Sequence, residues 1–180
     1  MYVEGGQFKA VNSQFVDNRC YAHGPDLGGG AIRALAQYKN RPVYITHDMF
    51  RGGRCSNGGA LSSISVQWDV LDSEFTNNKA IGWGANPASS GTPGGGSGGA
   101  IYLDGQDDNV LIAGTVMDNN GAREGGGAVF DVVDTGWGVL TVNGSHLHND
   151  ISGEFQTFPG IYYEIDGNDR APVMIKSTDS

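Results

Sequence analysis

Two short patterns alternate strictly along the chain, and this alternation restricts the fold more than any other feature of the sequence. The first pattern is a glycine pair followed by Ala and a large apolar residue. Its four copies begin at Gly29, Gly58, Gly98 and Gly126, and a degenerate copy is Pro159-Gly160-Ile161-Tyr162. The alanines of the four copies are spaced 29, 40 and 28 residues apart. A repeat of this length indicates an array of stacked units.

The second pattern is a large apolar residue with Asn or Asp three positions later. Its copies are Phe15/Asn18, Phe75/Asn78, Val116/Asn119 and Leu147/Asp150, and Phe50/Gly53 takes the same place in the second unit. Short β-branched and apolar runs lie between the patterns, and no run has a convincing helical period. Such a unit is too short for a propeller blade and fits one coil of a parallel β-helix. A β-sandwich with glycine-rich turns is the alternative, but it gives no reason for the fixed alternation.

Stacked coils place equivalent residues in columns along the axis of a solenoid. We expect one apolar column inside, with an asparagine ladder beside it of the kind that stabilises cross-β structures. The apolar column would consist of Phe15, Phe50, Phe75, Val116 and Leu147. The ladder would consist of Asn18, Asn78, Asn119 and Asp150. The glycine pairs would turn a corner of each coil, which explains part of the 30 glycines among 180 residues.

The two patterns together resemble the repeat of the polymorphic outer-membrane protein family, which occurs in cell-surface autotransporters and other pectate-lyase-like β-helices. The resemblance covers Phe15 to Val129 well and continues weakly to Ile165. It implies a right-handed parallel β-helix of about five coils with three short strands per coil. It also implies one domain over 1–180 that is a segment of a longer, secreted or cell-surface, adhesin-like protein. The repeat supplies a scaffold and carries no catalytic residues onto this chain.

Composition limits the partners of such a module. The net charge of −9 argues against nucleic acid, because binding a phosphate backbone needs clustered Lys and Arg. No apolar run approaches the ~18 residues needed to span a membrane. The segment 82–98 is rich in Gly, Ser and Pro and is predicted to be a mobile loop. The open ends of a solenoid favour end-to-end association, for example between Tyr2 of one chain and Val173 of another.

The two cysteines are predicted to lie in one column on adjacent coils. Cys20 and Cys55 each follow the phenylalanine of their unit by five residues. The separation of about 4.8 Å between stacked coils lies within the Cα range of disulfides. A disulfide would suit an exported protein, and a stacked pair of reduced thiols is the alternative.

An outward aromatic column is the predicted ligand-binding site. If Ile101 and its equivalents point inward, strand alternation turns the next residues outward. These residues are Tyr102, Phe130 and Tyr162, with Asp104 and Glu164 two positions further along their strands. Aromatic rings stack on the C–H faces of sugars, and carboxylates accept hydrogen bonds from hydroxyls. We therefore expect a flat, exposed platform that binds a glycan or another cell-surface ligand; rings covered by a loop or turned into the core are the alternative.

A second candidate site contains two histidines. His146 and His148 flank Leu147 and would share one outward face, with Asp118 on the preceding coil. Two imidazoles at this spacing can bind a metal if Asp118 or a loop residue such as Glu124 adds a third ligand. An ordinary solvated strand has the same pattern.

Two other functions remain open for this scaffold. The first is a carbohydrate-active enzyme, either a polysaccharide lyase or a glycoside hydrolase. Pectate-lyase-like enzymes gather acidic Ca²⁺ ligands and a basic residue on one face, whereas the acids of this chain are scattered. Calcium is the one cofactor that the resemblance suggests. Because the acids are scattered, no set of residues stands out as its ligands. The second is a structural component of a filament or shell.

Overall fold

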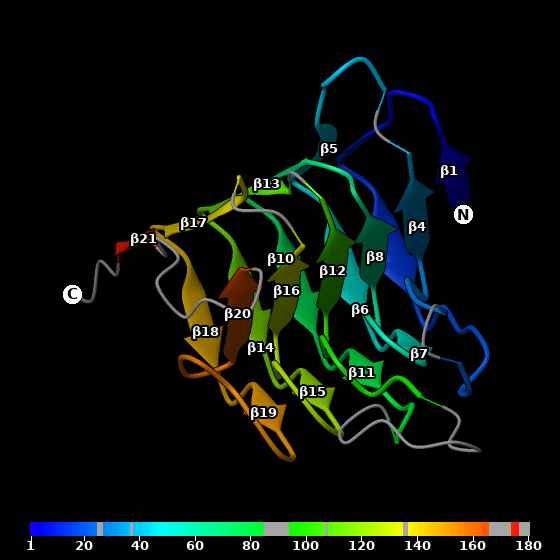
Figure 1. The fold of residues 1–180 in the computed structure, drawn as a ribbon, viewed down its shortest axis with the longest axis vertical. Coiled ribbons are helices and arrows are strands. Elements are labelled where there is room, and N and C mark those ends of the chain that lie inside the picture. The colour runs from blue at the N-terminus through cyan, green and yellow to red at the C-terminus, as the bar shows by residue number, and fades with distance from the viewer. Residues whose placement is uncertain are drawn as a thin grey trace.

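The repeats form a parallel β-helix. A computed structural model describes residues 1–24, 27–36, 38–84, 94–106, 108–134, 137–165 and 174–176. Within these ranges the chain forms strands and turns without any helix. The strands stack coil upon coil from β1 to β21 (Figure 1), and the ladders between them are parallel. This architecture confirms the fold predicted from the two alternating patterns.

Four parallel sheets, here called A to D in the order in which a coil visits them, make the walls of the solenoid. Sheet A contains β1 (Tyr2–Glu4), β4 (Ile32–Leu35), β8 (Leu61–Ile64), β12 (Ile101–Gly105), β16 (Val129–Val133) and β20 (Ile161–Ile165). Sheet B contains β2 (Lys9–Val11), β5 (Val43–Thr46), β9 (Trp68–Leu71), β13 (Asn109–Ala113), β17 (Val139–Asn143) and β21 (Met174–Lys176). Sheet C contains β3 (Gln14–Val16), β6 (Met49–Arg51), β10 (Glu74–Thr76), β14 (Val116–Asp118) and β18 (His146–His148). Sheet D contains β7 (Arg54–Cys55), β11 (Lys79–Ala80), β15 (Gly121–Ala122) and β19 (Ile151–Ser152).

Each full coil thus has four strands, where the sequence predicts three. The additional strand is the two-residue strand of sheet D, which is too short to show a hydrophobic period. Two residues separate the strands of sheets B and C in every coil, and two residues separate sheets C and D. The first residue of each of these bends has a positive φ, for example Asp72 at 46° and Asn119 at 56°. The tight left-handed bends explain the recurring Asp, Asn and Gly at these positions.

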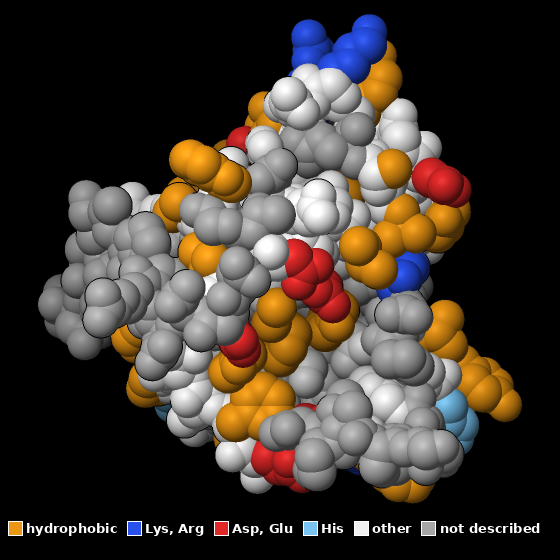
Figure 2. Space-filling view, in the orientation of Figure 1, with side chains coloured by type: hydrophobic (Ala, Val, Ile, Leu, Met, Phe, Trp, Pro, Cys, Tyr) orange, Lys and Arg blue, Asp and Glu red, His pale blue; other side chains and the backbone are white. Residues whose placement is uncertain are grey.

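The core contains the predicted stack of phenylalanines. The rings of Phe15, Phe50 and Phe75 lie parallel, with centroids 4.7 Å apart along the stack. Met117 and Leu147 continue this column in the next two coils. The prediction that Val116 belongs to it is wrong, because Val116 is 43% exposed while Met117 is fully buried. The outer surface of sheet A, by contrast, combines hydrophobic and acidic side chains (Figure 2).

The asparagine ladder also exists, shifted by one residue in the fourth coil. Asn78 Nδ2 donates to Asn120 Oδ1 at 3.0 Å, and Asn120 Nδ2 donates to Asp150 Oδ1 at 2.8 Å. The backbone N–H of Gly53 donates to Asn78 Oδ1 at 2.9 Å, which continues the ladder without a side chain. The assignment of Asn119 was wrong, because its positive φ places it in the bend. Asn18 is not part of the ladder either; its Nδ2 lies 3.5 Å from the backbone carbonyl oxygen of Val16.

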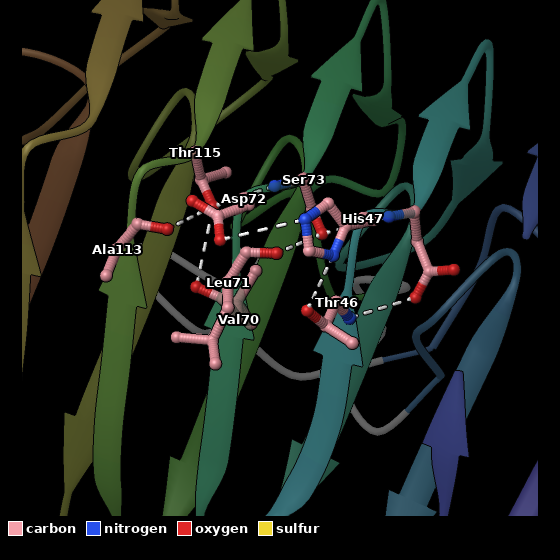
Figure 3. A network of polar contacts seen from close by, with 9 residues as sticks. Thr46, His47, Val70, Leu71, Asp72, Ser73, Ala113 and Thr115 are labelled. Carbon is pink, nitrogen blue, oxygen red and sulfur yellow. Dashed lines mark hydrogen bonds and ion pairs between the residues drawn. The ribbon is translucent and has the colours of Figure 1, made fainter. Parts of the chain in front are cut away.

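A second polar column, not predicted from the sequence, crosses the bend between sheets B and C. Its members are Ser13, Asp48, Ser73, Thr115 and Ser145. Asp48 accepts from the backbone N–H of Ser13 at 2.7 Å, and Ser73 Oγ accepts from the N–H of Asp48 at 3.1 Å. Figure 3 shows Ser73 and Thr115 within this network, beside the exposed pair His47 and Asp72. The column satisfies backbone groups that the sharp bend removes from the β-ladders.

The inserted segment lies at the corner between sheets D and A. Residues 85–93, the centre of the predicted mobile loop 82–98, lie outside the described residues. The described end, Gly94–Gly98, is buried. The N–H of Ser97 donates to Asn57 Oδ1 at 3.0 Å, and the Oγ of Ser56 donates to the carbonyl of Gly94 at 3.4 Å. This end of the insertion is therefore packed against the preceding coil.

The structure joins Cys20 to Cys55 across two coils, with a Cα separation of 4.7 Å and a sequence separation of 35. Loss of this bond, by reduction or by the variant Cys55→Ser, is expected to lower the free energy of unfolding by about 3–4 kcal/mol, because the reduced unfolded chain gains loop entropy. Denaturant unfolding with and without reductant measures the effect. The double variant Cys20→Ser/Cys55→Ser is the control and should not respond to reductant. Two freely alkylated thiols in the untreated protein would contradict the bond.

Candidate ligand-binding site

Three aromatic residues form a column on the outside of sheet A. Tyr102 of β12, Phe130 of β16 and Tyr162 of β20 are partners in the parallel register. The ring of Phe130 lies 5.1 Å from each tyrosine ring, with interplanar angles of 7° to Tyr102 and 21° to Tyr162. The three rings therefore occupy the register that strand alternation predicts.

The shape of the column differs from the exposed platform that we expected. All three rings are half-buried. Residues in register on adjacent coils lie about 4.8 Å apart, which is close to the centroid distance of stacked aromatic rings. The rings therefore pack face to face. Both faces of the Phe130 ring are consequently occupied by the tyrosines. A ligand would meet the edges of this column, and the broad aromatic face expected for sugar stacking is not offered by Phe130.

A fourth aromatic residue, Phe155, completes the cluster. It follows β19 and meets Phe130 and Tyr162 edge-on, at centroid distances of 6.3 and 4.7 Å. Its ring lies directly over Gly125, where a Cβ atom would come within 2.1 Å of the ring. The repeat patterns give no indication of Phe155, because it lies in a connecting segment outside both patterns. The additional glycine at Gly125 does not identify it, because Gly28 precedes another glycine pair and lies against Ser62 instead of a ring.

These rings line a cavity of about 420 Å³. Its apolar wall consists of Tyr102, Phe130, Val132, Phe155 and Tyr162, and its polar lining includes Asn57, Ser97, Glu124 and Glu164. No Lys or Arg is among the described lining residues. In Figure 2, hydrophobic side chains and carboxylates lie side by side near the centre of this face. The cavity size suits a small ligand or the end of a larger one.

Hydrogen bonds hold the tyrosines and carboxylates of the column in place. The hydroxyl of Tyr102 donates to Asp104 at 2.8 Å, and the hydroxyl of Tyr162 donates to Glu164. Burial, together with this bond to Glu164, raises the pKa of Tyr162 to about 12, so its hydroxyl stays a donor at neutral pH. Glu124, which is only 3% exposed, accepts from the backbone N–H of Gly84. Of the predicted ligand-binding residues, the described lining includes all except Asp104.

The histidine pair lies elsewhere, on sheet C. His148 Nδ1 lies 2.9 Å from Asp118 Oδ1, and both residues occupy the same register position on adjacent coils. His146 pairs with Val116 and is exposed on the same strand. Within the described ranges, no group of three or more His, Cys, Asp or Glu side chains is placed to hold a metal ion. The geometry therefore brings Asp118 to His148, and no third side chain among the described residues completes a metal site with this pair.

Comparison with known protein families connects this scaffold to a defined repeat. Residues 72–104 match the Chlamydia polymorphic membrane protein repeat. The matched stretch carries one copy of each pattern, Phe75/Asn78 and Gly98-Gly99-Ala100-Ile101, and ends within β12 beside Tyr102. The match covers less than half of the chain and supports the predicted resemblance to this repeat.

No curated protein and no solved structure matches the chain. In the described part of the chain, no helix has the length and apolar character needed to cross a membrane. The match to the polymorphic membrane protein repeat concerns part of the scaffold. The cavity beside β12, β16 and β20 is known only from the structure.

Proposed function

We propose that this β-helix is a cell-surface module that binds the end of a neutral glycan in the cavity beside the aromatic column. The observation that carries the proposal is the combination of four aromatic side chains with two glutamates around one cavity of about 420 Å³. The polymorphic membrane protein repeat supports a place on the cell surface. We extend the proposal to a protein that is secreted or displayed on the cell surface and acts as an adhesin.

The chemistry of the lining favours a neutral ligand rich in hydroxyl groups. Sugars combine apolar C–H patches with hydroxyl donors, and ligand sites commonly combine an apolar wall with a few fixed polar groups. Glu164 accepts from Tyr162 and keeps further acceptor capacity, because a carboxylate has about four lone-pair sites. Hydrogen bonds to ionised acceptors are stronger than those between neutral groups. An acidic glycan would instead bring like charges together.

Removing a ring of the cavity is expected to weaken glycan binding. Phe155→Ala and Tyr162→Ala should each lower affinity about 10-fold, because each removes apolar wall on one side of the cavity. A glycan array followed by titration calorimetry measures the loss. The control Trp137→Ala removes an aromatic side chain that is 79% exposed and outside the cavity lining, and it should bind as the unmodified protein does. Equal binding by all variants would place the glycan site elsewhere.

Neutralising one glutamate separates neutral from acidic glycans. Glu164→Gln keeps the shape of the lining and removes a negative charge, so affinity for a neutral glycan should fall severalfold. If the natural ligand were an acidic glycan, the same variant should bind it more tightly. Calorimetric titration of matched neutral and carboxylated oligosaccharides with both proteins distinguishes the two outcomes.

Glycoside hydrolysis is the second candidate function, because Glu124 and Glu164 line the same cavity. Glycosidases act through a pair of carboxyl groups on either side of the scissile bond. Release of reducing ends from a panel of neutral oligosaccharides, abolished in Glu124→Gln, would support hydrolysis. Binding without turnover would leave the module as a lectin-like surface.

A further inference from the structure

The outer surface of sheet D carries a row of basic side chains, which we call the basic stripe. It consists of Arg19, Arg54 and Lys79 on three consecutive coils. Arg19 and Arg54 are exposed, and Lys79 is half-buried. The stripe contains three of the 11 Lys and Arg residues of a chain with a net charge of −9. Sheet D therefore concentrates positive charge that the overall composition conceals.

The disulfide holds the two arginines of the stripe next to each other. Cys20 follows Arg19 and Cys55 follows Arg54, and their Cα atoms are 4.7 Å apart. The bond therefore fixes the backbones of two positively charged residues in register on adjacent coils. Among the described residues, neither Arg19 nor Arg54 forms an ion pair. Their guanidinium groups therefore remain available to an external anion.

Lys79 extends the row by one coil. Its Nζ donates to the backbone carbonyl of Asn119 at 2.7 Å, which orients the amine along the solenoid axis towards the fourth coil. Burial lowers the pKa of Lys79; the charge of Asp150 opposes this shift and that of Arg54 adds to it. The three cations thus form a linear array with the spacing of the coils.

We propose that the basic stripe binds a linear sulfated polysaccharide lying along the solenoid axis. A planar guanidinium matches the geometry of sulfate oxygens in the way it matches phosphate and carboxylate. One exposed ion pair contributes about 1 kcal/mol or less, so only a polymer that meets several cations at once would bind well. The acidic remainder of the molecule restricts such a polymer to sheet D.

The outward residues of sheet D favour a sulfated polysaccharide over single-stranded nucleic acid. Beyond the two basic residues of β7 and β11, they are Gly121 and Ile151, so the strands offer no aromatic ring on which bases could stack. The stripe also differs from the cavity on sheet A, whose described lining has no basic residue. The two surfaces therefore favour different glycans, a neutral one at the cavity and an anionic one at the basic stripe.

Binding to heparin tests the proposal. The purified protein should bind heparin with an affinity that falls steeply with salt concentration. Arg19→Gln/Arg54→Gln should weaken binding at least 10-fold and reduce the slope of log Kd against log salt by about two, because two counterion-releasing contacts are lost. Calorimetry or biosensor titration across several NaCl concentrations measures both quantities, and thermal unfolding verifies that the variant is folded.

The control is Lys9→Gln/Arg41→Gln, which makes the same change in net charge away from sheet D. It should keep the affinity of the unmodified protein within about twofold. Equal losses in the two double variants would show that only net charge matters and would overturn the proposal. Absence of binding at low salt would overturn it as well, and so would equally tight binding of a single-stranded oligonucleotide of matched charge.

Discussion

Replacement of Asn120 by alanine should destabilise the protein by about 4 kcal/mol. The Asn120 side chain is fully buried and makes hydrogen bonds to both neighbouring coils: it accepts from Asn78 and donates to the carbonyl of Phe75 on one side, and it donates to Asp150 on the other. Its loss leaves the amide of Asn78 and the carbonyl of Phe75 buried without these partners. Each unsatisfied group costs about 1–3 kcal/mol, and the small cavity left behind adds to that cost. Denaturant unfolding followed by circular dichroism measures the difference.

The neighbouring variant Asn119→Gly provides the control. Asn119 has a φ of 56°, a conformation that glycine adopts easily, and its side chain bonds only to Asp118 among the described residues. The change should alter stability by less than about 1 kcal/mol. A larger loss in Asn119→Gly than in Asn120→Ala would contradict the ladder register of the structure and favour the register predicted from the sequence.

Two buried acids make stability depend on pH in an unusual direction. Asp108 and Asp131 are fully buried, and their four carboxyl oxygens have no hydrogen-bond partner of good geometry among the described residues; the backbone N–H of Val66 near Asp108 opposes the rise of its pKa only in part. Burial, with a smaller contribution from Asp131, raises the pKa of Asp108 to about 9. Burial also raises the pKa of Asp131 well above its usual value, and the charge of Asp104 adds to this shift. Asp108 is therefore protonated in the folded protein at neutral pH, and burial shifts Asp131 in the same direction, towards the neutral form.

The free energy of unfolding is consequently expected to fall as pH rises from about 5 to 8. In this window the unfolded chain has released both protons, because the usual pKa of Asp is about 3.9. Folded Asp108 retains its proton, and folded Asp131 releases its proton only at a higher pH than usual. Each such carboxyl contributes a slope of up to about 1.4 kcal/mol per pH unit, which ends near the folded pKa. The protein should thus be most stable under mildly acidic conditions. Denaturant unfolding at a series of pH values measures the slope.

Asp131→Asn should reduce this slope and raise stability at pH 8, because the amide needs no proton to remain neutral. Asp17→Asn, at an exposed bend position, is the matched control and should leave the slope unchanged. A slope that is the same in both variants would mean that Asp131 is ionised in the folded protein.

The repeat patterns predicted what depends on strand alternation. The inward position of Ile101 fixes the outward position of Tyr102 and, through the parallel register, of Phe130 and Tyr162. The same alternation places Asp131 inside, because it follows Phe130 on β16. A hydrophobic pattern gives no reason to expect a carboxyl there, so the buried acid becomes evident only in the structure.

Other features depend on a single residue of register or on connecting segments. Val116 and Met117 are both apolar, and Asn119 and Asn120 are identical, so the pattern fitted two registers equally well. The structure selects the one in which an asparagine takes the left-handed bend. Phe155 reaches the cavity from a segment with no repeat, and contacts made by such segments are set by packing that has no sequence period.

The constant length of two bends has a consequence for how such a module can diversify. Two residues connect sheets B and C, and two connect sheets C and D, in every coil. The segment that connects sheets D and A varies in length: it comprises residues 56–60 in one coil and residues 81–100 in the next. Insertions at the D–A corner leave the ladder and the phenylalanine stack in register, and this corner borders the cavity through Asn57 and Ser97. Recognition can therefore evolve through changes in loop length, independently of the residues that make the solenoid fold.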